Sequence, residues 1–289
     1  MTSTLMMAAL AAALTSAEPD AAYRDEIARW REQREARLKS ETGWLSVAGL
    51  FWLKEGTSTF GRDPKSDIML PAGAPAVAGS FQRTGERVTV RPAAGVTLQI
   101  EGAPIAGETA LALDGKPLEV GPLRLQAIRR SDRIGIRLRD PESSIRRNFK
   151  TLDWFPVHER YRVTARFVPD AAPQKVAIAN VLGQTTEEPS PGRVEFEIDG
   201  KKLLLRPYIE DGDASQWFYV FRDATAPKVT YGGGRFLYSK PAEDGRVELD
   251  FNKAYNPPCA FNPYTTCPLP PKENLLSVDI PAGERKYQK

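Results

Sequence analysis

The stretch GERVTVRPAAGVTLQIEGAPIAGETALALDGKPLEVGPLRLQA, residues 85–127, decides the fold class. Short runs in it alternate apolar and polar residues, and turns such as Asp114-Gly115 and Gly121-Pro122 separate these runs. Alternation at every second residue indicates half-buried strands, and Gly or Pro between such runs indicates tight turns. Closely spaced short strands of this kind predict a β-sandwich.

The chain on either side of this stretch completes the architecture. Residues 20–41 predict one helix, because Ile27, Trp30, Arg34 and Leu38 fall at helical spacing. After residue 129 further short strands follow without long helices between them, which argues against a parallel α/β sheet. We therefore predict a mainly β protein: an N-terminal helical segment (18–43), a small sandwich (44–128), and a larger antiparallel sandwich or barrel (129–289) that ends in a proline-rich strap.

Composition limits the class of protein. The 289 residues are 41% apolar, which is enough for a buried core, and the formal net charge is only +3. Acidic and basic residues are mixed along the chain, whereas nucleic-acid binders concentrate basic charge on one face. We expect no nucleic-acid partner, no membrane span, no metal and no cofactor.

The first 17 residues predict a signal peptide. They are apolar, too short to span a bilayer, and end in small residues at Thr15 and Ala17. A leader on a cytosolic protein is the alternative, because no Lys or Arg precedes the apolar run. We expect a periplasmic or secreted protein.

Part of the predicted small sandwich resembles a known domain. Thr59–Pro64 and Ser66–Pro71, followed by Glu101-Gly102 and Asp114–Leu118, resemble the layout of a forkhead-associated (FHA) domain. Members of that family read phosphothreonine with an Arg, a Ser-x-x-His element and an Asn-Gly pair. Only Arg62 has a counterpart here, so the resemblance implies the shape of the domain and not its phosphopeptide activity.

The C-terminal part has the most distinctive amino-acid sequence. Residues 250–271 read DFNKAYNPPCAFNPYTTCPLPP, and together with Gly43-Trp-Leu and Tyr231-x-x-x-Arg235-Phe-Leu they resemble an uncharacterised bacterial family known only as a domain of unknown function. The resemblance extends over nearly the whole chain and implies membership without a known activity. The prolines exclude regular helix, so this tail is either the rigid rim of a pocket or a structural strap.

Cys259 and Cys267 lie in this tail and are the only cysteines. In an exported protein an even pair most simply forms a disulfide, which is our prediction. Free structural thiols, or a reactive or metal-bound cysteine, are the alternatives.

Polar residues between the strands supply the candidate site, since convergent Arg and aromatic side chains can hold a carboxylate or phosphate. We predict a binding module for a small anionic molecule or peptide. The alternatives are a hydrolase that uses Asp223 or Asp250 with His158 or a bound water, and a structural envelope interaction protein. The candidate ligand-binding residues are Arg137, Arg146, Asp223, Tyr231, Arg235, Asp250, Asn252, Tyr255 and Asn256.

Overall fold

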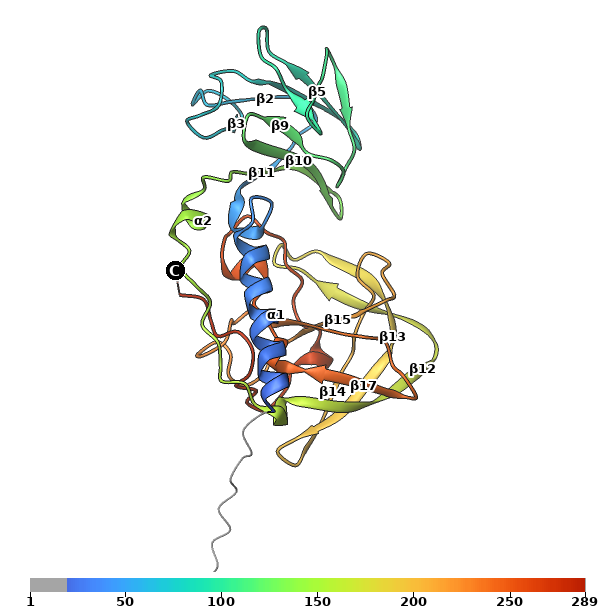
Figure 1. Ribbon diagram of the computed structural model, residues 1–289. Helices are drawn as coiled ribbons and strands as arrows, with labels where there is room; N and C mark the ends of the chain where they lie inside the picture. The colour runs from blue at the N-terminus through green and yellow to red at the C-terminus, as the bar shows by residue number, and fades with distance from the viewer. Residues whose placement is uncertain (1–19, 289) are drawn as a thin grey trace, which may run out of the picture.

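The described chain, residues 20–288 of a computed structural model, is built mainly from short strands in two β units (Figure 1). This confirms the predicted mainly β fold class. The predicted signal peptide, residues 1–17, lies outside the described residues. Within the described residues, no helix is both long and apolar enough to cross a membrane.

The first unit is a sandwich of two sheets. The six-stranded sheet runs in the order β1 (Val47–Trp52), β11 (Arg133–Arg139), β10 (Leu123–Arg130), β9 (Leu118–Val120), β6 (Gln99–Ile100) and β7 (Ala103–Pro104). The five-stranded sheet runs in the order β3 (Ile68–Met69), β2 (Gly56–Gly61), β4 (Gly79–Thr84), β5 (Arg87–Pro92) and β8 (Thr109–Leu111).

The core of the sandwich follows from the alternation in the sequence. Leu123, Leu125 and Ala127 of β10 face inward, and Phe60 stacks on Phe81 with ring centroids 4.4 Å apart. Strand β11 pairs with β1 along its length, so the sandwich extends to Arg139, beyond the predicted boundary at residue 128.

The second unit contains a four-stranded and a two-stranded antiparallel sheet. The four-stranded sheet has the order β14 (Lys201–Leu205), β13 (Thr185–Ile198), β12 (Arg162–Ala179) and β17 (Arg246–Asp250), and the two-stranded sheet pairs β15 (Trp217–Phe221) with β16 (Arg235–Ser239). Neither sheet closes on itself within the described residues, so this unit is a sandwich rather than a barrel.

Two helices connect the units. Helix α1 (Ala21–Lys39) lies along the second unit, with its C-terminal end toward the first (Figure 1). Ile27 and Leu38 on its predicted apolar stripe are buried, and Arg34 forms an ion pair with Glu284. The short helix α2 (Ser144–Asn148) follows the sandwich.

The C-terminal segment after β17 is a strap. It contains three short 3-10 turns, η3 (Phe251–Lys253), η4 (Pro258–Ala260) and η5 (Lys272–Asn274), besides η1 (Trp44–Ser46) and η2 (Glu159–Tyr161) earlier in the chain. Asn274 donates its amide to the carbonyl oxygens of Arg206 and Val220 at 2.9 Å each. The strap is therefore bonded to the strands of the second unit rather than open to solvent.

Candidate functional site

Asp223 and Arg235 form a buried ion pair at the end of the two-stranded sheet. Each side chain is 1% exposed, and Arg235 also donates to the carbonyl oxygens of Ala282 and Ile280 in the strap. Burial lowers the pKa of Arg235, and Asp223 acts against that shift. Asp223 and Arg235, both predicted to bind a ligand, are thus bonded to each other, and the buried guanidinium joins β16 to the strap.

Asp250 and Asn252 lie in a second buried network. The Tyr23 hydroxyl of α1 donates to Asp250 Oδ1 at 2.8 Å, and the Asn252 backbone N–H donates to the same oxygen at 3.1 Å. The Asn252 side chain also accepts from the His158 N–H and donates to the His158 carbonyl, both at 3.0 Å. These contacts fix α1 and the chain before β12, which is a structural role.

Asn256 is fully buried beside Glu284. Its N–H donates to Glu284 Oε2 at 2.8 Å, and its side-chain amide donates to the Arg285 carbonyl at 2.7 Å. Burial raises the pKa of Glu284, while Arg34 acts to lower it. Asn256, another of the predicted ligand-binding residues, therefore holds two segments of the strap together.

The remaining predicted residues are scattered. Arg146 donates to the carbonyl oxygens of Lys39 and Pro141, both at 2.7 Å. Arg137 lies at 5.2 Å from the Trp44 ring in the first unit, and Tyr231 lines a cleft beside Cys259. The structure therefore does not bring Arg137, Arg146, Tyr231 and Tyr255 to one site.

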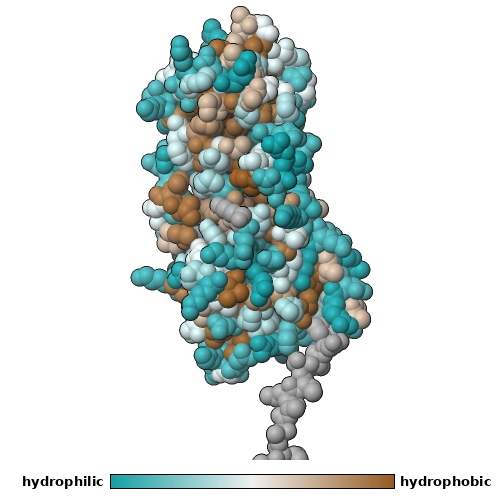
Figure 2. Space-filling view, turned by 90° about the vertical axis from the view of Figure 1, so that its left-hand side faces the viewer, coloured by the Kyte–Doolittle hydropathy of each residue, from teal (hydrophilic) through white to brown (hydrophobic). Residues whose placement is uncertain are grey.

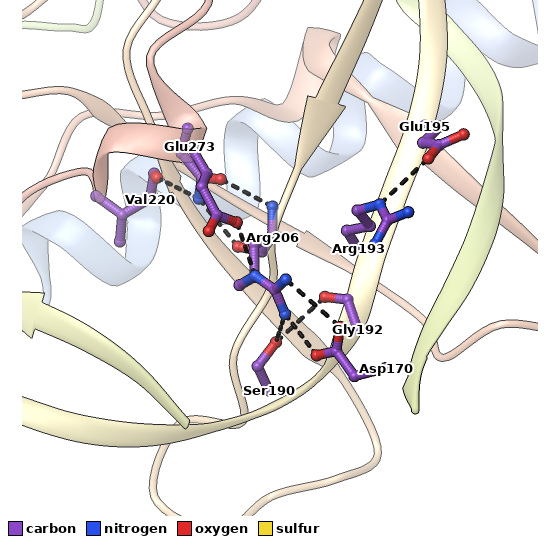
Figure 3. Close-up of polar contacts among 9 residues, drawn as sticks. Asp170, Ser190, Gly192, Arg193, Glu195, Arg206, Val220 and Glu273 are labelled. Carbon is purple, nitrogen blue, oxygen red and sulfur yellow. Dashed lines mark hydrogen bonds and ion pairs between the residues drawn. The ribbon is translucent and has the colours of Figure 1, made fainter. Parts of the chain in front are cut away.

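Arg206 shows how the second unit satisfies another of its arginines (Figure 3). Its guanidinium bonds to Asp170 at 2.6 Å and to Glu273 at 2.7 Å. Burial acts to lower the pKa of Arg206, but these two carboxylates outweigh it and raise the pKa. The Arg206 guanidinium is therefore already bonded to protein carboxylates and joins β12 to the strap. It is not a candidate for binding an anionic ligand.

A groove does form between α1 and the β15–β16 sheet. Its volume is about 430 Å³, and it shares Gln216, Tyr238 and Lys253 with a neighbouring hollow of about 670 Å³. We call the smaller space the helix–sheet groove; its lining residues are Trp30, Arg34, Arg37, Gln216, Tyr238, Lys253 and Tyr255. Of the predicted site residues, Tyr255 lines the groove and Asp250 lines the neighbouring hollow.

The groove has aromatic walls. Tyr238 and Tyr255 are stacked with ring centroids 6.5 Å apart and an interplanar angle of 14°, and Trp30 is 6.3 Å from Tyr255. The Arg34 guanidinium lies 4.5 Å from the centroid of the Tyr255 ring. Half-buried rings of this kind offer flat apolar surface to a ligand.

The charge of the groove is positive. Its lining includes three cationic side chains and no carboxylate. Arg34 is paired with the buried Glu284, and Lys253 bonds to Glu26 at 2.6 Å, whereas Arg37 is exposed and has no side-chain partner among the described residues. Arg37 is therefore the cation available to an incoming anion.

A half-buried acid bonds to one wall of the groove. The Tyr238 hydroxyl donates to Glu210. Burial raises the pKa of Glu210, and the bond from Tyr238 opposes this rise. The pair fixes the orientation of the Tyr238 ring at the groove wall. Within residues 20–288 no three His, Cys, Asp or Glu side chains converge as a metal site would require.

Sequence reasoning missed Trp30, Arg34, Arg37 and Tyr238. The signal was the stripe of α1, in which Trp30 and Arg34 are one turn apart, but an amphipathic stripe indicates packing before it indicates a site. Only the structure, in which α1 lies beside Tyr238 of β16, shows that Trp30 and Arg34 of this stripe line a groove.

Comparisons with known proteins find a family model and solved structures that are similar to parts of the chain. Residues 147–285 match the model of a family described as "Protein of unknown function (DUF1684)". An uncharacterized protein from Haloarcula marismortui, solved by NMR in solution, is 31% identical over 50% of this chain and 82% of its own, with a TM-score of 0.42. No curated protein matches the chain.

Solved FHA domains are similar to a smaller part of the chain. A domain from a study of phosphothreonine-dependent FHA interactions and the FHA domain of FhaA in complex with the intracellular domain of Rv3910 are each 19% identical. Each covers 31% of this chain and 92% or 97% of its own, with TM-scores of 0.23 and 0.24. None of these matches supplies an activity for this chain.

Proposed function

We propose that this chain, which belongs to the DUF1684 family of proteins of unknown function, binds a small anionic molecule with a flat apolar portion in the helix–sheet groove. One observation carries the proposal: the groove combines the rings of Trp30, Tyr238 and Tyr255 with cations and no carboxylate. The flat apolar portion of the ligand would pack on the aromatic wall, and its anionic group would lie near Arg37. Each part would then exchange water for a complementary protein surface.

The hydrolase alternative has less support. Asp223 is enclosed with Arg235, and Asp250 is buried with Tyr23 and Asn252. His158 Nδ1 accepts from the Arg160 backbone N–H, a local bond of a turn. General acid–base chemistry requires its groups within hydrogen-bond reach of a substrate, and the described side chains give these three no common cleft.

Titration calorimetry with benzoate and phenyl phosphate, and with benzamide as the neutral isostere, tests the binding proposal. We expect the two anions to bind more tightly than benzamide. We also expect their affinity to fall as the salt concentration rises, because salt screens exposed charges. Arg37→Glu is expected to weaken anion binding about tenfold or more, which corresponds to about 1.4 kcal/mol.

Arg29→Glu is the matched control, because Arg29 is also exposed on α1 but does not line the groove. It makes the same change in net charge, so we expect its effect to stay within about twofold. Equal losses in both variants, or no preference for anions over benzamide, would refute the proposal and favour a structural interaction protein.

We also propose export, on the strength of the first 17 residues. Mass spectrometry of protein from periplasmic and culture fractions is expected to find a chain that begins near Glu18. A full-length chain confined to the cytosol would contradict it.

A further inference from the structure

The two cysteines lie side by side at the edge of the strap. The Cys259 N–H donates to Cys267 Sγ at 3.2 Å, and the Thr265 hydroxyl donates to Cys259 Sγ at 2.9 Å. Both are free thiols in the structure, so the predicted disulfide is not formed there. The loop between the two cysteines therefore holds their side chains close together without a disulfide bond.

The two thiols differ in access. Cys259 is half-buried and lines a cleft of about 580 Å³, whose wall also contains Lys228, Tyr231 and Lys286. Cys267 is 6% exposed and packs in the apolar cluster with Phe218 and Phe236. Residues 286–288 of the cleft wall lie next to the C-terminal end of the chain, which is on the left of Figure 1, and Figure 2 shows that side as a mixture of polar and apolar side chains. A molecule in the cleft can reach Cys259 first.

The polar contacts of Cys259 favour its thiolate. The neighbouring Cys267 thiol, and the bond that the Thr265 hydroxyl donates to the Cys259 sulfur, act against burial and lower the pKa of Cys259 to about 6. The contact with Cys259 and burial raise the pKa of Cys267. A thiolate with a second thiol behind it is the arrangement that carries out thiol–disulfide exchange.

We infer that Cys259 and Cys267 form a reversible dithiol–disulfide site for small disulfides, in which Cys259 attacks and Cys267 resolves. This site shares no residue with the helix–sheet groove and is independent of the proposed binding function. The exposed Lys228 and Lys286 at the cleft favour a disulfide that carries carboxylates.

The exchange has two balanced steps. The Cys259 thiolate attacks one sulfur of R–S–S–R, a bond forms between them, and R–S⁻ leaves with the electron pair of the broken S–S bond. Cys267 then gives its proton to the first released R–S⁻ and attacks Cys259 Sγ, which closes the protein disulfide and releases the second R–S⁻, which takes a proton from water. The protein dithiol is oxidised, and the small disulfide is reduced to two thiols.

Incubation of the reduced full chain with oxidised glutathione tests the site. We expect mass spectrometry to show the loss of two hydrogen masses and no lasting adduct. Cys267→Ser is expected to stall as a glutathione adduct on Cys259, and Cys259→Ser is expected to react at least about tenfold more slowly than wild type, because the buried thiol remains protonated. Circular dichroism checks that both variants fold, and Cys267→Ala replaces Cys267→Ser if the latter does not.

Two further measurements exclude a merely structural pair. The rate of alkylation of Cys259 by iodoacetamide in wild type should rise with pH around a midpoint near 6, whereas an ordinary thiol has its midpoint near 9. Oxidised glutathione should react faster than the cationic disulfide cystamine, and Lys286→Glu should narrow that difference.

Several outcomes would overturn the inference. They are glutathione adducts on both cysteines of wild type without an internal disulfide, equal reactivity of Cys259→Ser, or an alkylation midpoint near 9. A purified protein whose disulfide resists millimolar glutathione would show a permanent structural bond instead.

Discussion

Arg235→Met is expected to destabilise the second unit strongly, because it leaves the Asp223 carboxylate buried and unpaired. Breaking a buried ion pair by removing one partner costs about 3–5 kcal/mol. The substitution also removes the donor to the Ala282 carbonyl oxygen, and a buried acceptor left without a partner costs about 1–3 kcal/mol, whereas the Ile280 carbonyl still accepts from the Ala282 N–H. We therefore expect a loss of about 5 kcal/mol, a large part of the 5–15 kcal/mol that typically separates folded from unfolded protein.

Urea unfolding followed by circular dichroism measures this loss, and a double-mutant cycle separates its parts. In Arg235→Met with Asp223→Leu no charge is stranded, so the double variant should be more stable than the sum of the two single changes by about 2 kcal/mol or more. Arg222→Met is the matched control, because Arg222 is an exposed neighbour of Asp223 and its loss should stay within about 0.5 kcal/mol.

The reasoning fails if Arg235→Met behaves like Arg222→Met, or if the two single changes simply add. Either result would mean that water reaches the pair, and the guanidinium would then be open to a ligand after all.

Two further perturbations test charges away from this pair. Burial raises the pKa of Glu210, so the folded chain binds that proton more tightly than the unfolded chain, and this contribution to stability is lost as pH rises from about 4.5 through the raised pKa. Glu210→Gln should flatten the pH dependence of thermal unfolding between pH 4 and 8, and identical slopes would contradict the assignment. Arg137 is 4% exposed, its Nε has no hydrogen-bond partner among the described residues, and burial lowers its pKa to about 10. Arg137→Met should leave the free energy of unfolding unchanged or raise it by about 1 kcal/mol, since a buried charge without a counterion is costly; a loss above about 2 kcal/mol in urea would show that its contact with Trp44 outweighs that cost.

The strands could be predicted where their signal is local. Trp217–Phe221 forms strand β15, and its five consecutive apolar residues between polar turns admit few other structures. The separation of the two units could not be predicted in the same way. Strand β11 resembles the strands after it, and it belongs to the first unit only because β1, far earlier in the chain, pairs with it.

The candidate site shows the same limit. Sequence places Asp223 and Arg235 near each other at strand ends, and the structure does join them. Residue type does not reveal how buried a side chain is, however, and both side chains of this pair are only 1% exposed. The groove depends on the bond between Arg34 and Glu284, which are 250 residues apart, so no local pattern could reveal it.

Both proposed sites stand on the same C-terminal strap but use different residues of it. Tyr255 lines the helix–sheet groove, and Cys259, four residues later in η4, lines the separate cleft. A failure of Arg37→Glu to weaken anion binding would therefore leave the dithiol site intact, and the converse also holds. Arg235 is different, because it fixes the strap that carries both sites. Arg235→Met should therefore weaken anion binding in the groove and slow closure of the Cys259–Cys267 disulfide together. Both losses should occur at urea concentrations too low to unfold the first unit. If only one of the two activities fell, the strap would not be the common support that its hydrogen bonds indicate.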